Sequence, residues 1–348
     1  MKKVVISGYY GFENYGDELS LQTIVNALKN QGVAISAFSS KPELTSFENN
    51  IICFQSFDIF DIIRQIFVAD VLISGGGSLL QDKTSIKSFL YYIFVIWTAK
   101  ILGKKVVIFS QGFAPLKHRF LEKILRKTLK KINYISVRDE ESRLYLESLG
   151  IYPKAFADCV WAFGRTKTLK KNKVLVQLRD TGYLTDEKIK IMAKLIAEKY
   201  SRTKIEILPL QEEKDLEICE KIYEEFKELK ADVELLKNLT ISETTEALAS
   251  SRNLIAMRYH ACLVGIKHNA NILAISYDEK VTNLAQKFEL PYVYADEKID
   301  LFEIEFKKSL EKFEHCRISL EIIRAEENLA QKSIENLIKT INDIEISE

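Results

Sequence analysis

Three cations and a histidine recur in the second half of the chain, each just after a short apolar run. They are Arg179, Arg258 and Lys280, with His260. If the apolar runs are strands of one parallel sheet, these side chains meet outside the carboxyl ends of the strands, where such sheets bind ligands. Guanidinium groups bind carboxylates and phosphates through paired hydrogen bonds, and the start of a helix adds attraction for an anion. A lone arginine is usually in a surface ion pair and a lone histidine is usually structural. Recurrence at three strand ends instead favours one joint site for a small anion.

A glycine-containing loop follows the first apolar run. Residues 8–18 read GYYGFENYGDE, and the spacing of the glycines is not that of the GxGxxG dinucleotide fingerprint. The amide of Asn14 and the carboxylate of Asp17 lie just before a predicted helix and could bind a hydroxyl-rich ligand. The alternative for Asp17 is that it caps this helix.

Two more loops carry polar groups at predicted strand ends. Residues 74–82 read SGGGSLLQD, so Gly75 and Gly76 could let a substrate lie against the backbone, with Gln81 beside it. Gln111 begins a similar loop after the next predicted strand. The alternative in both places is an ordinary turn. A third strand end carries the pair Arg138 and Asp139, which we interpret as an ion pair that caps a helix.

Short apolar runs alternate with amphipathic stretches throughout, which predicts parallel sheets with crossover helices. A chain of 348 residues exceeds the roughly 250–300 residues that one core usually supports. We therefore expect an α/β fold of two Rossmann-like domains facing across a cleft, with C-terminal helices crossing back to the first domain. The expected boundaries are 1–165 for the N-terminal domain, 173–300 for the C-terminal domain and 301–348 for a helical segment. The pattern stops near residues 158–173, where the polar and basic segment FGRTKTLKKNK, residues 163–173, should form a linker.

Composition excludes several classes of protein. Lys plus Arg number 50 and Asp plus Glu number 49, so no overall charge favours nucleic acid. Five scattered cysteines without a CxxC pair indicate neither a disulfide framework nor a metal site, and favour a reducing compartment. The start MKKVVISG is predicted to be a strand rather than a signal peptide. The longest apolar run, residues 88–99, is far shorter than the ~20 residues of a spanning helix. A cytoplasmic protein is expected.

These segments, in this order, resemble the polysaccharide pyruvyl transferase family. The resemblance rests on NYGDE, GGGSLLQD, QGFAPL, SVRDEES, FADCVWAF, MRYHACL and ISYDEKV, and spans residues 8 to about 281. The nearest subgroup is the bacterial enzymes that modify cell-wall polysaccharides used to anchor surface-layer proteins. Two positions depart from the family pattern. Tyr259 stands where leucine is usual, and Cys159 stands where proline is common.

The resemblance implies a GT-B-like fold. No metal ligands cluster in the sequence, so we expect no metal requirement, and no cofactor is expected. The resemblance also implies that phosphoenolpyruvate donates its enolpyruvyl group to two hydroxyls of one sugar, forming a ketal. The acceptor would be a lipid-linked saccharide, with transient contact at the inner membrane face. The family motif that holds the donor corresponds to Arg258 and His260. Whether the chain forms a homo-oligomer stays open.

Roles for individual residues follow as hypotheses. The donor would be held by Arg179, Arg258, His260 and Lys280. The acceptor would be held by Asn14, Asp17, Gly75, Gly76, Gln81 and Gln111. Asp17 is the candidate base, and His260 is either the acid or a phosphate ligand. Replacing Arg258 or His260 with alanine should abolish phosphate release with the fold intact. The alternative function is a glycosyltransferase of the same fold that uses a nucleotide sugar, with Asp278 and Glu279 near its ribose.

Overall fold

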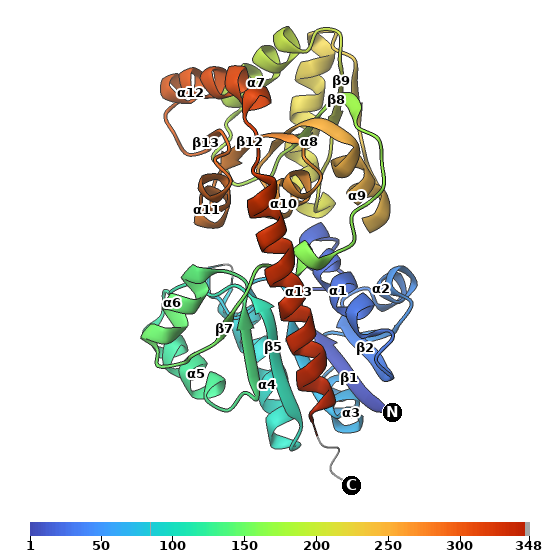
Figure 1. Ribbon diagram of the computed structural model, residues 1–348. Helices are drawn as coiled ribbons and strands as arrows, with labels where there is room; N and C mark the ends of the chain where they lie inside the picture. Colours follow the sequence, from blue (N-terminus) through green and yellow to red (C-terminus); the bar gives the residue numbers. More distant parts are fainter. Residues whose placement is uncertain (84, 345–348) are drawn as a thin grey trace. The chain divides into compact units, whose positions relative to one another are not determined.

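The computed structural model describes residues 1–83 and 85–344, and the chain divides into two compact units (Figure 1). The N-terminal unit comprises Met1–Phe163 and the chain from Ala325 onward, and the C-terminal unit comprises Gly164–Arg324. Each unit is built on one parallel sheet. This confirms the expected α/β class with two Rossmann-like units.

The N-terminal sheet has seven strands in the order β3-β2-β1-β4-β5-β6-β7. Its elements are β1 (Lys2–Ser7), α1 (Tyr15–Leu28), β2 (Val33–Ser39), α2 (Pro42–Asn49), β3 (Ile52–Gln55), α3 (Ile59–Val68), β4 (Val71–Gly75), α4 (Ile86–Ile101), β5 (Lys105–Gln111), α5 (Arg119–Leu129), β6 (Tyr134–Val137), α6 (Glu140–Ser148), β7 (Lys154–Ala155) and the 3-10 turn η1 (Cys159–Ala162). The strand order reverses between β1 and β4. Ligands bind at such a switch point, so the loops after these two strands are well placed for a site.

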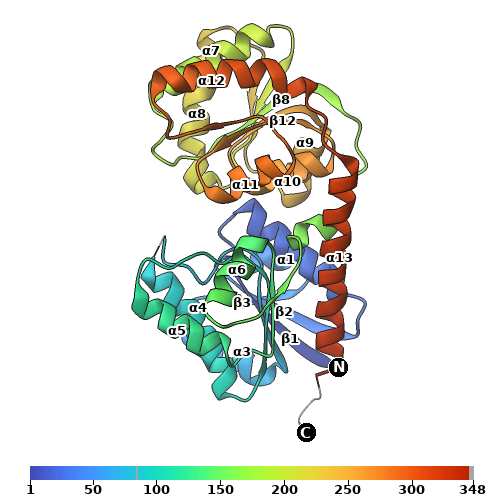
Figure 2. The ribbon, with the colours of Figure 1, turned by 60° about the vertical axis from the view of Figure 1, so that its left-hand side comes forward.

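Alternate side chains of the central strands point to opposite faces of this sheet. Val5 and Leu72 pack under α3, α4 and α5. Val4 and Ile73 pack on the other face, under α1 and the C-terminal helix α13 (Leu320–Asn342). Figure 2 shows the two helical layers on either side of the sheet.

Helix α13 joins this unit through its second half. Ile334, Leu337 and Ile341 share one helical face and are buried against the sheet. The ammonium group of Lys2 donates hydrogen bonds to the carbonyls of Ile341 and Asn342, at 2.7 and 2.6 Å. The bonds satisfy carbonyls that the last helical turn leaves open. The C-terminal helix therefore crosses back to the first unit, as expected.

The C-terminal sheet has six strands in the order β10-β9-β8-β11-β12-β13. Its elements are β8 (Lys171–Gln177), α7 (Asp186–Lys199), β9 (Lys204–Ile207), α8 (Glu212–Glu228), β10 (Val233–Leu235), α9 (Ile241–Ser250), β11 (Ser251–Ala256), α10 (Tyr259–Lys267), β12 (Asn271–Ser276), α11 (Glu279–Lys287), β13 (Tyr292–Tyr294), α12 (Ile299–Lys312) and the 3-10 turn η2 (Phe313–His315). Here the order reverses between β8 and β11. Residues 174–176 of β8 and 254–256 of β11 are continuous buried apolar runs, as expected for strands covered on both faces.

The turn η1 lies in the N-terminal unit, because Cys159 and Trp161 are buried and η1 packs against α1. One boundary differs from the expectation. Helix α12 belongs to the C-terminal unit, because Phe302 and Phe306 fill the core beside α7. Of the expected helical segment 301–348, only the part from Ala325 onward belongs to the N-terminal unit.

Candidate active site: two groups of strand-end residues

Arg258 is a buried cation of the C-terminal unit. It lies directly before α10, and its side chain is almost fully buried. Nε and Nη2 donate hydrogen bonds to Oδ2 and Oδ1 of Asp215, both at 2.6 Å, and Nη2 also reaches Oε1 of Gln211 at 3.3 Å. This is the paired geometry in which a guanidinium binds a carboxylate most strongly. The arginine is thus fixed at the end of β11 by the first turn of α8.

Gln177 links the ends of β8 and β11. Its amide oxygen accepts the backbone N–H of Arg258 at 2.8 Å, and its side chain is completely buried. The backbone N–H of Arg179 donates to the sulfur of Met257 at 3.3 Å. These contacts set the backbone direction at two neighbouring strand ends, and therefore the directions in which Arg179 and Arg258 project.

Arg179 extends across the end of β11 to Tyr277, which follows β12. Nη1 of Arg179 donates to the phenol oxygen at 2.7 Å, and the guanidinium lies 5.0 Å from the ring centroid. β8 and β12 flank β11 in the sheet, so this contact spans three strand ends. The charge is held without a carboxylate in this contact, which leaves it available to attract an anion.

Lys280 completes a positive group with Arg179 and Arg258, and His260 lies in the first turn of α10. Asp278 caps α11 by accepting the backbone N–H of Lys280 at 3.1 Å, and the ammonium group of Lys280 lies 3.8 Å from the same carboxylate. The rings of Tyr259 and His260, in the first turn of α10, meet edge to face with centroids 5.1 Å apart. The structure therefore places Arg179, Arg258 and Lys280 after three adjacent strands, with His260 beside them in sequence.

The three glycines at the end of β4, Gly75 to Gly77, lie directly on α1 in the N-terminal unit. A Cβ atom on Gly75 would come within 2.7 Å of Ile24, one on Gly76 within 2.7 Å of Ser20, and one on Gly77 within 2.4 Å of Asp17. Ile24, Ser20 and Asp17 share one face of α1. Gly75 and Gly76 are buried. This corrects the expectation that they offer open backbone to a substrate, because α1 fills that space.

Asp17 stands in the first turn of α1, beside Gly77. The residue before the helix is Asn14, whose carbonyl accepts the backbone N–H of Asp17 at 2.9 Å. Asn14 makes no side-chain capping bond to the helix. The helix begins three residues earlier than expected, so Asp17 is an in-helix residue rather than its N-cap. Its carboxylate is half-buried at the switch point of the sheet.

Glu18 is a second carboxylate in this turn, and it points into the protein. Its Oε1 accepts the backbone N–H of Gly11 at 2.7 Å, and the side chain is almost completely buried. Burial raises the pKa of Glu18 to about 8, against the opposing effect of the Gly11 hydrogen bond and with a further increase from Asp17. The neutral carboxyl anchors the loop between β1 and α1. Gly11, whose N–H it accepts, has a positive φ of 79°.

Tyr10 links the same loop to the glycine segment. Its hydroxyl donates to the carbonyl of Gly75 at 2.6 Å, and the ring is completely buried. The loops after β1 and β4 are thereby joined across the switch point.

The remaining predicted acceptor residues lie nearby in the fold. Gln81 is half-buried, and its amide oxygen accepts the backbone N–H of Lys83 at 2.6 Å. Gln111 is fully buried and donates to the hydroxyl of Ser74 at 2.7 Å. Burial makes Gln111 a bridge between β4 and β5, which corrects its expected contact with an acceptor.

Asp82 joins the loops after β4 and β5. It accepts the backbone N–H groups of Lys117 and His118, both at 3.0 Å, and lies 2.8 Å from Nδ1 of His118. Burial raises the pKa of Asp82, but these hydrogen bonds outweigh burial, and the pKa is lowered overall. His118 carries no role in the sequence interpretation, and the structure places it in this Asp–His pair.

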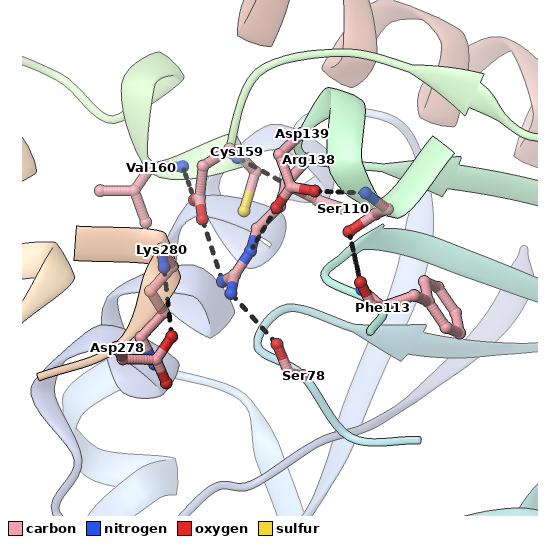
Figure 3. Close-up of polar contacts among 11 residues, drawn as sticks. Ser78, Ser110, Phe113, Arg138, Asp139, Cys159, Val160, Asp278 and Lys280 are labelled. Atoms are coloured by element: carbon pink, nitrogen blue, oxygen red, sulfur yellow. Dashed lines mark hydrogen bonds and ion pairs between the residues drawn. The ribbon is translucent and has the colours of Figure 1, made fainter. Parts of the chain in front are cut away.

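Arg138 joins several loops of the N-terminal unit (Figure 3). Its guanidinium donates to Asp158 at 3.2 Å and to the hydroxyl of Ser78 at 3.1 Å. A side chain on Gly112 would collide with it, because a Cβ there would lie 2.9 Å from Nε and Nη2. Asp139 does cap α6, by accepting the backbone N–H of Ser142 at 2.8 Å, and lies 3.6 Å from Arg138. The expected cap is present, but the shorter contacts of Arg138 hold the loops after β4 and β5 and the 158–162 turn.

Sequence reasoning missed Asp215, Gln177 and Tyr277. Asp215 looks like one of many acidic residues at a helix start, yet it is in helical phase with the buried residues Ile218 and Ile222. That phase is the signal that could have identified it. Among the residues that the structure describes, no group of three or more His, Cys, Asp or Glu side chains is arranged to hold a metal ion.

The fold is shared with enzymes that act on sugar nucleotides. A putative UDP-N-acetylglucosamine 2-epimerase from Listeria monocytogenes superposes with a TM-score of 0.65 at 10% identity, over 98% of this chain and 96% of that one. The UDP-GlcNAc 2-epimerase of Methanocaldococcus jannaschii gives 0.65 at 12% identity, over 97% of this chain and 100% of that one. A spinosyn rhamnosyltransferase complexed with thymidine diphosphate gives 0.55 at 9% identity, over 99% and 100%. Such low identity shows a GT-B-like fold alone.

The family of this chain is shown by its sequence rather than by its fold. The model of the polysaccharide pyruvyl transferase family matches residues 14–279, more than half of the chain. The chain belongs to that family and is a transferase. No curated protein matches it.

Proposed function

We propose that this protein transfers the enolpyruvyl group of phosphoenolpyruvate to two hydroxyls of a sugar in a polysaccharide precursor. The observation that carries the proposal is the positive group after β8, β11 and β12, in a chain that belongs to the pyruvyl transferase family. Phosphoenolpyruvate carries a carboxylate and a phosphate close together. Arg179, Arg258 and Lys280 are the groups that would hold those charges.

The reaction balances without a cofactor. A proton adds to the methylene carbon of phosphoenolpyruvate, which leaves positive charge at C2. One sugar hydroxyl forms a bond to C2, the bond from C2 to the phosphate oxygen breaks, and the second hydroxyl closes the ketal. The two sugar hydroxyls lose two protons in total. In the overall balance, one proton is gained by the new methyl group and the other by the departing phosphate. The cations stabilise the phosphate as it leaves.

Individual residues are assigned roles within this proposal. In Arg258, Nη1 is the nitrogen that the bonds to Asp215 and Gln211 do not use, so it would face the donor. His260 is either the proton donor or a phosphate ligand. Asp17 is the proposed base for the acceptor hydroxyl, with Asn14 and Gln81 holding the sugar.

The finer details of the acceptor are also proposals. We propose a lipid-linked saccharide, as in the subgroup that modifies polysaccharides anchoring surface-layer proteins, and a cytoplasmic enzyme in transient contact with the inner face of the membrane. None of the helices that the structure describes is long and apolar enough to cross a membrane.

A nucleotide-sugar donor is the alternative, because a structurally similar rhamnosyltransferase is complexed with thymidine diphosphate. In this chain Asp278, a candidate ribose ligand, caps α11 and lies beside Lys280. Titration with phosphoenolpyruvate and with UDP distinguishes the two. Saturable binding of UDP without binding of phosphoenolpyruvate would favour the alternative.

The direct test incubates the enzyme with phosphoenolpyruvate and candidate lipid-linked saccharides. We expect phosphate release that requires the saccharide, and a product whose mass has increased by one pyruvate ketal. The Asp17→Asn variant should still bind phosphoenolpyruvate but should not transfer it. Phosphate release without any change in the mass of the saccharide would contradict pyruvyl transfer.

A further inference from the structure

Helix α3 carries apolar side chains on its outer surface as well as its inner one. Ile62 and Ile66 are buried against the sheet, whereas Phe60, Ile63 and Phe67 are exposed by 85%, 41% and 65%. A helix that covers a sheet normally turns polar residues to water. The exposed side chains are therefore not explained by the core of the unit.

The apolar surface continues onto the next helix. α3 and α4 pack side by side on the same face of the sheet (Figure 2). The ring of Phe57, just before α3, lies 5.4 Å from that of Tyr91 in α4. We define the α3–α4 apolar surface by six exposed residues: Phe57, Phe60, Ile63, Phe67, Phe94 and Ile101. Contiguous apolar surface of this kind marks a place of interaction.

Positive charge is concentrated beside this surface. Residues 83–131 contain twelve Lys and Arg and a single acidic residue, Glu122, a formal charge of +11. The whole chain has a charge of +1, so the rest of it is net negative. Ten of these twelve cations are exposed, and they lie in α4, α5 and the adjoining loops. α3 itself adds no positive excess, because Arg64 is offset by Asp61.

Lysines and aromatic rings are interleaved at the junction of α3, α4 and α5. The indole of Trp97 donates to the hydroxyl of Thr128 at 2.9 Å, which joins α4 to α5. The ammonium groups of Lys127 and Lys131 lie 5.9 and 4.7 Å from the Trp97 ring, and that of Lys104 lies 5.7 Å from the Phe67 ring.

The cations are close enough to affect one another. Burial lowers the pKa of Lys100, and the neighbouring charges of Lys105 and Lys131 lower it further. A surface on which lysines repel each other has a strong preference for an anionic partner.

We infer that the α3–α4 apolar surface and the cations of α4 and α5 dock together on an anionic lipid surface. Apolar and aromatic side chains would enter the boundary between headgroups and acyl chains, and the lysines would contact the headgroup charges. A second copy of this chain fits less well, because a two-fold interface would bring two such positive faces together. The role of this contact, which is to bring the enzyme to a lipid-linked acceptor, rests on the proposed function. The test of lipid binding does not depend on that function.

The test measures cosedimentation of the whole purified chain with vesicles, in the absence of both substrates. We expect binding to vesicles that contain phosphatidylglycerol, at least about tenfold tighter than to vesicles of phosphatidylcholine alone, and weaker at high salt. Equal binding to both kinds of vesicle, or binding to neither, would overturn the inference.

Matched variants separate the two contributions. Phe60→Ser and Phe67→Ser should each weaken vesicle binding about tenfold, because each removes an apolar ring that would leave water. Lys127→Glu and Lys131→Glu should weaken it about fivefold per unit of charge. The controls are Leu169→Ser, at an 86% exposed position of the C-terminal unit, and Lys194→Glu with Lys307→Glu, on exposed helical positions there. Controls that weaken binding as much as the test variants would overturn the assignment to this surface.

Two more measurements identify other outcomes. If Phe60→Ser and Phe67→Ser convert a dimer to a monomer in light scattering and leave vesicle binding unchanged, the surface joins two copies and the inference is wrong. Transfer to a water-soluble acceptor fragment should be normal in all these variants. Vesicle binding without any pyruvyl transfer would contradict the proposed function and leave this inference standing.

Discussion

Arg258 and Asp215 form a two-bond ion pair inside the C-terminal unit, with Nε and Nη2 each 2.6 Å from a carboxylate oxygen. Asp215 is completely buried and also accepts the backbone N–H groups of Leu210 and Gln211, at 3.2 and 3.1 Å. The arginine that the sequence assigns to donor binding is therefore also a structural residue. Its position is set by a carboxylate on a different helix.

Arg258→Ala should for this reason lower stability as well as activity. The change leaves the Asp215 carboxylate buried without its main counterion, which costs roughly 3–5 kcal/mol in the free energy of unfolding. Urea denaturation measures this cost. This prediction differs from the one made from the sequence alone, which was that phosphate release would be lost while the fold stayed intact. An unchanged urea midpoint would show that the pair contributes nothing to stability.

A double variant separates stability from binding. Arg258→Met with Asp215→Leu removes both charges and should recover most of the lost stability, because apolar groups of similar volume can replace a buried pair. It should not recover the affinity for phosphoenolpyruvate. Recovery of that affinity would exclude Arg258 from the donor site.

Glu18→Gln should change how stability depends on pH. The pKa of Glu18 is about 8 in the folded protein, against an ordinary value of 4.5. Between these values the folded chain holds a proton that the unfolded chain has lost, so stability falls as pH rises, by up to about 1.4 kcal/mol per pH unit. Glutamine keeps the oxygen that accepts the Gly11 N–H but does not titrate. The variant should match the wild type near pH 5 and exceed it near pH 8 in thermal unfolding.

The control for this change is Glu13→Gln. Glu13 lies in the same loop, but it is exposed and bridges to Lys41 at 2.8 Å. This variant should keep the pH dependence of the wild type. If Glu18→Gln keeps it as well, the buried carboxyl does not carry the proton.

Sequence patterns predicted the architecture well where strands are continuous apolar runs. The apolar runs that include Val4, Val71, Val106, Val174 and Leu254 all form strands, as their alternation with amphipathic stretches predicts, because both faces of each are covered. The same alternation does not predict α2, β3 and α3 within residues 42–70. β3 is an edge strand with exposed Ile52, and α3 carries exposed Phe60 and Phe67 beside its polar side chains, so neither has the usual apolar pattern.

The candidate site was predictable in its positions but not in its contacts. Cations after strands could be located because strand ends of a parallel sheet share one edge. The partners of those cations come from distant residues such as Asp215 and Tyr277, and nothing local predicts which helix supplies them. The glycines at 75–77 were interpreted as open backbone, because sequence does not show that Ser20 and Ile24 of α1 occupy the space beside them.

Tyr277→Phe should weaken donor binding without unfolding the protein. It removes the hydroxyl that accepts from Arg179 at 2.7 Å but keeps the ring under the guanidinium. Loss of a hydrogen bond to a charged group predicts a rise of roughly tenfold in the KM for phosphoenolpyruvate, with kcat little changed. Tyr183→Phe, at an exposed position of the same unit, is the control and should leave KM unchanged. A fall in kcat at constant KM would instead place Tyr277 in the chemical step.

Gly77→Ala should stop transfer by moving Asp17. Gly77 has a φ of +65°, and a Cβ there would lie 2.4 Å from Oδ1 of Asp17. Gly32→Ala is a matched control, because Gly32 has a φ of +66° in the same unit and no described atom within 4 Å of such a Cβ. Both variants incur the backbone cost of about 1–2 kcal/mol for a left-handed residue, but only Gly77→Ala displaces the carboxylate. Calorimetry should show normal binding of phosphoenolpyruvate to both, and phosphate release with acceptor should fall at least about a hundredfold in Gly77→Ala alone, as expected when a catalytic base is misplaced. Equal activity in the two variants would mean that the position of Asp17 does not matter to the reaction, and the base would have to be sought elsewhere.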